Sequence, residues 1–441
     1  MVLMYYNIIM KIIKPINPLI EKMLSKKEII DKDNLRPLCF VFEKEIEEGK
    51  LLFNSLTKEL LLLEDGEYPI EYLFNHRFLV PIEHDDIKFV DEIRNLTKML
   101  FPIRGINSYT ILTTTDCNAR CFYCYEKGIE KISMDKSTAL DVVDYIIAHK
   151  EKDKDVHLAW FGGEPLYNID AINIITNKLK EKGINYTSSM ISNGYLMDEE
   201  TSKVAKENWN LKRIQITLDG THDIYNRRKA YIYSDDAFNR VINNIHHLLD
   251  REIRVTIRLN LDDRNYEDLK ELIYYLTKEF NGNKYLNVYS HLIFQTYWDN
   301  SEGRIKELYD KQNKISEYIY ANKLARIKKL EDKPKINHCM ADSGKSVVIL
   351  PDGKLHMCEH INENETFGTI YDDKGYKEAH KLWCERYPII EECKNCKLYA
   401  TCIKLKHCPN AKETCLEIER QIKINDIYKS MQKEYKNSKA L

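Results

Sequence analysis

The sequence predicts an α/β fold, a partial (β/α)6 barrel with an α+β domain before it and a cysteine-rich domain after it. Between about residues 109 and 294, strand-length apolar runs alternate with segments of helical period. About 100 residues before this region show short strand patterns, and eight of the 12 cysteines fall between Cys339 and Cys415. We therefore expect three domains, at residues 1–104, 105–304 and 305–441.

The central region contains six predicted β–α units, too few for a closed eight-fold barrel. Amphipathic helices are expected between the strands, for example over Thr138–His149 and Ala237–Leu249, and Gly183 is placed to end one of them. In an open or closed barrel of this kind, ligands bind at the carboxyl ends of the strands. The predicted strands are Tyr109–Thr114, Val156–Phe161, Tyr186–Ile191, Arg213–Leu218, Arg254–Leu261 and Leu286–Phe294.

The flanking segments differ from this repeat. Leu38–Glu67 reads as short strands joined by glycine and charged turns, and Ile87–Leu100 reads as a helix. The apolar N-terminus lacks the basic region and cleavage site of a signal peptide, so we interpret it as a strand or a packed arm. Ile305–Leu330 is predicted to form a charged helix that leads into the cysteine-rich tail.

Composition excludes several classes of partner. The 67 Lys and Arg residues nearly balance 69 Asp and Glu residues, so no basic field favours nucleic acid or an anionic membrane. No apolar run approaches the ~18 residues that a membrane-spanning helix needs. We expect a cytoplasmic protein. Because thiols stay reduced there, the 12 cysteines indicate metal ligation and not disulfides.

A first cysteine cluster follows the first strand of the predicted barrel. Cys117, Cys121 and Cys124 have the spacing C-x3-C-x2-C. Three thiolates can hold three irons of a [4Fe–4S] cube and leave the fourth iron open to a small molecule with amino and carboxylate groups. A structural zinc site is the alternative, but it needs four ligands, and the loop supplies no fourth Cys or His.

These residues resemble the radical S-adenosylmethionine (SAM) superfamily. Tyr123 matches the aromatic position whose backbone contacts the adenine, and Gly162-Gly163-Glu164 resembles the motif that receives the methionine amino group. Ser192 and Asn193 resemble the segment that contacts the ribose. The resemblance implies that one of the two arginines after the Thr217–Gly220 motif, Arg227 or Arg228, pairs with the methionine carboxylate, with Arg258 as a rival.

The tail closely resembles the SPASM extension, which binds two auxiliary [4Fe–4S] clusters. The resemblance implies three [4Fe–4S] clusters in all, with SAM at the first. The longer loop after Cys402 departs from the common pattern, and the second auxiliary set has three ligands unless Cys384 completes it; a zinc ribbon is the alternative for the whole tail. The implied sets are Cys393, Cys396, Cys402 and Cys415 for one cluster, and Cys339, Cys358 and Cys408 for the other.

In peptide-modifying members of this family, a winged-helix-like domain before the barrel grips the leader of a precursor peptide. The hairpin-like residues 36–65 could offer an edge for such a peptide. A structural cap over the barrel is the alternative. The resemblance also implies an electron donor such as flavodoxin or ferredoxin.

Three functions follow from these patterns. The favoured one is a maturase that installs a carbon–carbon or carbon–sulfur cross-link in a ribosomally made precursor peptide through 5′-deoxyadenosyl radical hydrogen abstraction. The second is an anaerobic sulfatase-maturating enzyme that forms formylglycine. The third is a non-catalytic zinc-binding protein.

Overall fold

The computed structural model divides the chain into two compact units, each built from separate stretches of sequence. One unit contains residues 103–326 and 340–383, and the other contains 1–102, 327–339 and 384–441. The expected C-terminal domain, 305–441, is thus shared between them. The described residues are 2–5, 8–24, 31–64, 68–124, 126–280, 282–293, 302–335, 337, 339–360, 366–384, 391–402 and 417–439.

The first of these units is built on a sheet with the strand order β13-β12-β11-β10-β9-β8-β14-β15-β16. Its six central strands pair in parallel and confirm the predicted partial barrel. Each predicted strand is present within two residues of its expected start, and Phe294 lies outside the described residues. These strands are β8 (Ser108–Thr114), β9 (Val156–Gly162), β10 (Tyr186–Ser192), β11 (Leu211–Leu218), β12 (Arg254–Leu261) and β13 (Leu286–Leu292).

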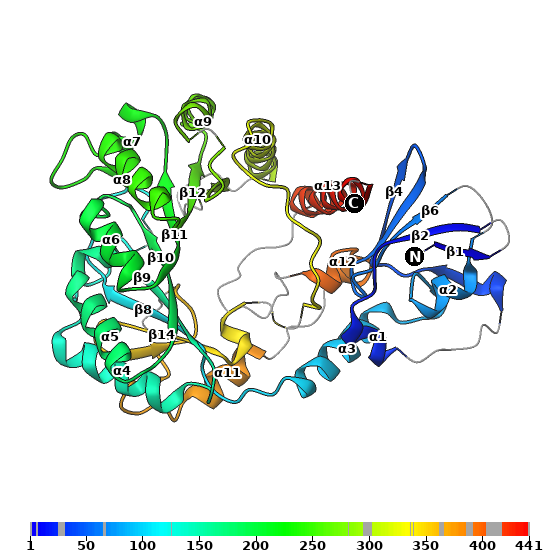
Figure 1. Cartoon of the computed structure of the whole chain (residues 1–441), viewed down its shortest axis with the longest axis horizontal. Coiled ribbons are helices and arrows are strands. Elements are labelled where there is room, and N and C mark those ends of the chain that lie inside the picture. Colours follow the sequence, from blue (N-terminus) through cyan, green and yellow to red (C-terminus); the bar gives the residue numbers. More distant parts are fainter. Residues whose placement is uncertain are drawn as a thin grey trace. The chain divides into compact units, whose positions relative to one another are not determined.

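Helices cover the outer face of this sheet (Figure 1). The strands bury alternate residues against them, as in β9, where Leu158 and Trp160 are buried while His157 and Ala159 point to the other face. The inner face is therefore free for polar side chains. The helices are α4 (Lys136–His149), α5 (Ile169–Glu181), α6 (Glu199–Glu207), α7 (His222–Lys229), α8 (Phe238–Asp250) and α9 (Tyr266–Phe280).

The sequence did not predict that the tail extends this sheet. Strand β14 (Ser346–Ile349) pairs in parallel with β8, and β15 (Lys354–His356) and β16 (Gly368–Thr369) follow in antiparallel pairing. Val348 packs with Leu112 of β8 in a shared apolar cluster. Helix α11 (Tyr376–Cys384) comes next in the chain. The strand that precedes the first cysteine cluster thus has neighbours on both sides.

The predicted helix over Ile305–Leu330 is wrong at its C-terminal end. Helix α10 spans Glu302–Ala321 and packs on β13, where Gln312 Nε2 donates to the carbonyl oxygen of Ser290 at 3.1 Å. Lys323 adopts φ 58°, a left-handed conformation that ends helical geometry. The lysine-rich residues after Lys323 keep the charged composition of the helix but do not form one.

The second unit contains an antiparallel sheet of order β1-β2-β6-β5-β4 and a two-stranded ribbon, β3-β7. It confirms the expected α+β character, and the apolar N-terminus forms strands. The strands are β1 (Val2–Tyr5), β2 (Ile8–Lys14), β3 (Leu35–Pro37), β4 (Val41–Ile46), β5 (Gly49–Asn54), β6 (Leu60–Leu63) and β7 (Leu79–Pro81).

Both faces of the sheet are buried at strand β6. In β6, Leu61 and Leu63 pack in one core, while Leu60 and Leu62 pack in a second core on the opposite face. This arrangement explains why four consecutive leucines form a strand with no polar face. The helices of this unit are α1 (Pro18–Met23), α2 (Ile70–Asn75), α3 (Asp86–Leu100), α12 (Glu391–Lys394) and α13 (Glu417–Lys439), so α3 confirms the helix expected near 87–100.

Candidate active site

The loop that carries Cys117, Cys121 and Cys124 starts where β8 ends. Asp116 fixes its beginning, because its carboxylate accepts from the backbone N–H of Cys117 at 2.8 Å and pairs with Lys131 at 2.8 Å. Cys117 and Cys121 are half-buried and Cys124 is exposed. Burial raises the pKa of the Cys117 thiol to about 12. A bound metal would have to displace this proton, since thiolates are the ligating form.

Two glycines allow the end of β9 to approach this loop. A Cβ atom on Gly162 would lie 2.1 Å from the carbonyl oxygen of Thr114, and one on Gly163 would lie 2.4 Å from that of Asp116. Gly162 also has φ 120°, which other residues rarely adopt. The backbone N–H of Glu164 donates to the carbonyl oxygen of Asp116 at 2.9 Å. In this structure the glycines bring two segments of the chain together.

The carboxylate of Glu164 joins the ends of β9 and β10. It is fully buried and accepts from Ser192 Oγ at 2.8 Å, the N–H of Asn193 at 2.8 Å and the N–H of Leu166 at 3.2 Å. Burial raises the pKa of Glu164 to about 7, although these hydrogen bonds oppose the shift. Three residues that the sequence predicts for SAM binding, Glu164, Ser192 and Asn193, are therefore neighbours.

Asn193 connects this group to the first cysteine. Its Nδ2 lies 3.8 Å from Cys117 Sγ and donates to Asn118 Oδ1 at 2.7 Å. Asn118 is fully buried, and within the part of the chain that the structure describes its own Nδ2 has no hydrogen-bond partner. A buried amide donor without a partner is costly and marks a position where a bound group would complete the hydrogen bonding.

A second buried group lies on the other side of the loop. The Tyr123 hydroxyl donates to Asp219 Oδ2, and Lys229 Nζ lies 4.0 Å from the same oxygen. The other oxygen, Oδ1, has no hydrogen-bond partner among the described residues. Burial would lower the pKa of Lys229, but Asp219, Tyr123 and Cys121 raise it well above its ordinary value. Lys229 therefore stays an ammonium beside the loop, where its carbonyl oxygen also accepts from the N–H of Arg120 at 3.0 Å.

Arg228 and Arg258, which the sequence indicates as candidates for the methionine carboxylate, have different surroundings. Arg228 is buried and pairs with Asp262, with Nη2 and Oδ2 2.9 Å apart, while its guanidinium lies 4.9 Å from the ring centre of Phe122. Arg258 lies on the inner face of the barrel, and its Nη2 is 3.2 Å from His291 Nδ1. The buried Nε of Arg258 has no hydrogen-bond partner in the described ranges.

These residues fit a [4Fe–4S] cluster with bound SAM. The loop supplies three soft thiol ligands, and buried polar atoms without partners surround it on Asn118 and Asp219. Cys117, Cys121 and Cys124 would hold the cluster. No group of three or more His, Cys, Asp or Glu side chains suited to a single metal ion occurs within the described ranges.

The C-terminal cysteines lie in several segments. Cys393, like Cys39, packs against one core of the N-terminal domain, and Cys396 packs against the other. Cys402 follows a short 3-10 helix, Tyr399–Thr401. Cys339, Cys358 and Cys384 are in described segments of the chain, whereas Cys408 and Cys415 lie outside the described residues. The ligand sets of the auxiliary clusters remain a prediction.

Sequence reasoning missed three residues of the site. Asn118, Lys229 and Asp262 carry no motif of their own, and each is recognised only by what surrounds it in the fold. Asp219 lies within the Thr217–Gly220 motif, but no role was predicted for it. Its position could have indicated one, because an aspartate directly after a buried strand lies at the end of the barrel where ligands bind.

Residues 111–276 match the family model described as the Radical SAM superfamily. A cysteine-type anaerobic sulfatase-maturating enzyme of Clostridium novyi is 31% identical over 144 residues, which is 30% of this chain and 37% of that protein. The family match, the parallel-strand fold and the cysteine loop agree, so residues 111–276 form a radical SAM domain.

Solved structures give the same architecture. The enzyme anSMEcpe with bound AdoMet aligns with a TM-score of 0.57 at 16% identity and covers 76% of this chain and 100% of its own. SuiB of Streptococcus suis, bound to precursor peptide SuiA, aligns with a TM-score of 0.51 at 11% identity, over 83% of this chain and 94% of its own. At these identities the likeness is one of fold. Among the helices of the described residues, none is both long and apolar enough to cross a membrane.

Proposed function

We propose that this enzyme is a maturase that installs a carbon–carbon or carbon–sulfur cross-link in a ribosomally made precursor peptide. Bound at the barrel mouth, a reduced [4Fe–4S] cluster and SAM would supply a 5′-deoxyadenosyl radical that takes a hydrogen atom from the peptide. Formation of the cross-link releases a second hydrogen as a proton and one electron. The auxiliary clusters of the SPASM-like tail would accept that electron.

The chain's own residues position and shield these groups. Cys117, Cys121 and Cys124 would hold the cluster, and Asn118 and Asp219 would offer their unpartnered polar atoms to the bound nucleotide. The buried Glu164 keeps the ends of β9 and β10 at a fixed separation, which preserves the distance over which a hydrogen atom is transferred. An electron donor such as flavodoxin or ferredoxin is part of this proposal.

One observation carries the choice of a peptide substrate, namely the α+β domain with an edge strand. Within the described sheet, β4 pairs only with β5, so the other edge of β4 offers backbone groups to an extended peptide. Strand β6 pairs on both sides and is closed to this use. SuiB, which shares the fold, is described in complex with its precursor peptide.

The substitution Cys117→Ala tests the chemistry. It should abolish formation of 5′-deoxyadenosine from SAM under reducing, anaerobic conditions, because one iron of the cluster loses its protein ligand. Chromatography of the reaction mixture measures the product. Undiminished 5′-deoxyadenosine in this variant would contradict the assignment, whereas Cys39→Ala, outside the proposed ligand sets, serves as the control.

The product distinguishes the cross-link from the second candidate, a sulfatase-maturating activity. That candidate is favoured by the 31% identity to the enzyme of Clostridium novyi. A cross-linked peptide loses two hydrogens only, whereas formylglycine formation from cysteine loses two hydrogens and also replaces the sulfur with an oxygen from water, with release of hydrogen sulfide. Mass spectrometry of the peptide after reaction decides between them. The non-catalytic zinc-binding interpretation is set aside, because the chain contains a radical SAM domain.

A further inference from the structure

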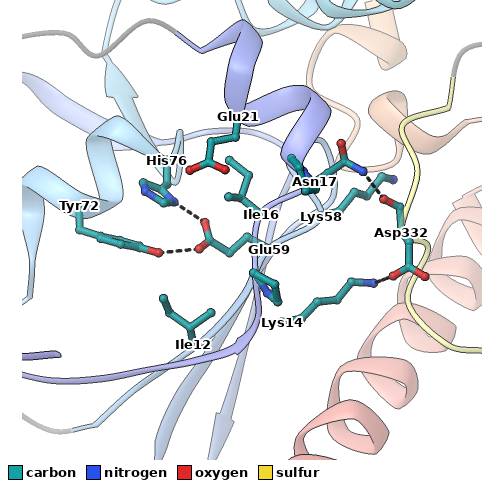
Figure 2. A pocket seen from close by; sticks show the side chains of 12 residues that line it. Ile12, Lys14, Ile16, Asn17, Glu21, Lys58, Glu59, Tyr72, His76 and Asp332 are labelled. Carbon is teal, nitrogen blue, oxygen red and sulfur yellow. Dashed lines mark hydrogen bonds and ion pairs between the residues drawn. The ribbon is translucent and has the colours of Figure 1, made fainter. Parts of the chain in front are cut away.

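The N-terminal domain contains a cavity of ≈ 470 Å³ that lies apart from its edge strand β4. Figure 2 shows its lining, which comes from the end of β2, the start of α1, the turn between β5 and β6, α2, and residue Asp332. Apolar side chains such as Ile12 and Ile16 share this lining with Lys14 and Lys58. We name this space the N-terminal cavity.

Lys58 is the unusual member of the lining. It lies in the turn after β5, where φ 68° and a hydrogen bond from its N–H to the carbonyl oxygen of Asn54 at 2.8 Å fix its backbone. Asn54 Oδ1 supports the turn by accepting from the N–H groups of Leu56 and Thr57 at 3.0 and 3.1 Å. The turn therefore fixes the backbone position from which the Lys58 side chain reaches the cavity lining.

The Lys58 ammonium is not satisfied there. The side chain is 1% exposed, and among the described residues Nζ has no hydrogen-bond partner. It forms an ion pair with the Glu331 carboxylate, which is 3.6 Å away and 57% exposed. An ammonium has three donors, and burying it without acceptors is costly. An anionic group that enters the cavity would supply the missing acceptor.

Its neighbour Glu59 does not supply that acceptor. The Glu59 carboxylate accepts from the Tyr72 hydroxyl at 2.6 Å and from His76 Nδ1 at 2.8 Å. The two rings stack with their centres 3.9 Å apart and form a flat wall beside the cavity. Figure 2 shows these two interactions on the side of Glu59 away from Lys58.

The chain's own segment Leu330–Asp332 shows what kind of ligand the rim accepts. Lys14 Nζ donates to the carbonyl oxygens of Leu330 and Glu331 at 3.0 and 3.2 Å and pairs with Asp332. Asn17 Nδ2 donates to the carbonyl oxygen of Asp332 at 2.7 Å. An acidic peptide segment is thus already held at the rim by its main chain, with the Glu331 and Asp332 carboxylates facing the two lysines.

We propose that the N-terminal cavity binds an acidic segment of the peptide substrate, with Lys58 receiving a carboxylate and Leu330–Asp332 acting as an internal competitor. The proposal rests on the proposed function only in taking the ligand to be the substrate peptide. It differs from pairing along β4, because recognition here depends on a charged side chain and not on strand hydrogen bonds.

Direct binding tests the proposal with the full-length, cluster-loaded protein. The probe is a fluorescein-labelled peptide of sequence LED, identical to residues 330–332 and free of lysine, and its neutral counterpart LQN is the matched control. Fluorescence anisotropy should show at least tenfold tighter binding of the acidic peptide, a difference of about 1.4 kcal/mol. Equal binding of the two peptides overturns the proposal without the need for any variant.

Two substitutions should act in opposite directions. Lys58→Met should weaken binding of the acidic peptide about tenfold, and the double change Glu331→Gln with Asp332→Asn should strengthen it, because the competitor loses its charges. Lys22→Met, at an exposed position of α1, controls for general electrostatic attraction. Unchanged binding in either test variant, or an equal loss with Lys22→Met, contradicts the proposal.

A third arm separates the two sources of carboxylate. N-acetylglutamate amide should not displace the labelled peptide at concentrations where the unlabelled acidic peptide does; displacement by it would assign the cavity to a free carboxylic acid and overturn the peptide form. Because anisotropy needs no turnover, peptide binding without any peptide-dependent formation of 5′-deoxyadenosine would count against the proposed function and leave the cavity assignment standing.

Discussion

At the scale of single residues, each unit contains a buried ionisable side chain, and the two side chains differ in their hydrogen bonding. Glu164 and Lys58 are each almost fully buried, but Glu164 accepts three hydrogen bonds whereas Lys58 Nζ makes none with the described residues. The Glu164 carboxylate therefore stabilises the fold through its hydrogen bonds, whereas burial of the Lys58 ammonium destabilises it. These opposite situations give opposite predictions for stability.

Glu164→Ala should destabilise the protein. The change removes the acceptor for Ser192 Oγ and for the backbone N–H of Asn193, and each buried donor left unpaired costs about 1–3 kcal/mol. We expect a loss of about 2–4 kcal/mol in the free energy of unfolding. Urea denaturation measures it. Glu200→Ala, at an exposed position of α6, should change stability little. A similar loss of stability in both variants would contradict the stabilising role of Glu164.

Lys58→Met should have the opposite effect and remove a pH dependence. Burial lowers the pKa of Lys58 from 10.5 to about 8, so between these values the unfolded chain binds more protons than the folded one. Stability must therefore rise with pH from about 8 to 10.5, by up to about 3 kcal/mol. The variant should lack this rise relative to the native chain in unfolding measurements across that range. The charged groups around Lys58 are Glu331, Lys14 and Lys335, and Glu21, Glu59, His76 and Asp332 line the same cavity.

At the scale of elements, the geometry of the cysteine loop depends on the close approach of the end of β9 to the end of β8. Gly162→Ala should disturb this loop, because the new Cβ would lie 2.1 Å from the Thr114 carbonyl oxygen at a backbone φ of 120°. We expect a loss of about four irons per chain after anaerobic reconstitution. Gly183→Ala is the matched control, with φ 67° and open space around its Cβ, and should cost about 1 kcal/mol without loss of iron. Full iron in Gly162→Ala would contradict this account.

The elements also show what the sequence could and could not predict. The six barrel strands were predictable because each is a strand-length, largely apolar run next to a segment of helical period, and the cysteine spacing marked the loop after the first of them. Strand β14 was not predictable, since four residues, SVVI, carry too little pattern and their partner β8 is more than 200 positions away. Likewise, the pairing of Arg228 with Asp262 depends on two loops that only the fold brings together.

At the scale of the whole molecule, the cofactor content follows from the cysteines. Three [4Fe–4S] clusters predict about twelve irons per chain after anaerobic purification. Cys393→Ala should lower this by about four and leave the cluster at Cys117 able to cleave SAM, whereas cross-linked peptide should decrease because the substrate electron loses its route. Iron analysis with quantification of 5′-deoxyadenosine and peptide measures all three. Unchanged iron in this variant would contradict the auxiliary assignment.

The parallel pairing of β14 with β8 has a consequence for biosynthesis. As the ribosome releases the chain from its N-terminus, β8 and the cysteine loop emerge more than 200 residues before the strand that completes their sheet edge. During that interval β8 has a neighbour only on the β9 side, and its outer edge is open to wrong partners. Stable iron loading at Cys117, Cys121 and Cys124 is therefore expected only after translation of residue 349, so a nascent chain truncated before β14 should take up little iron.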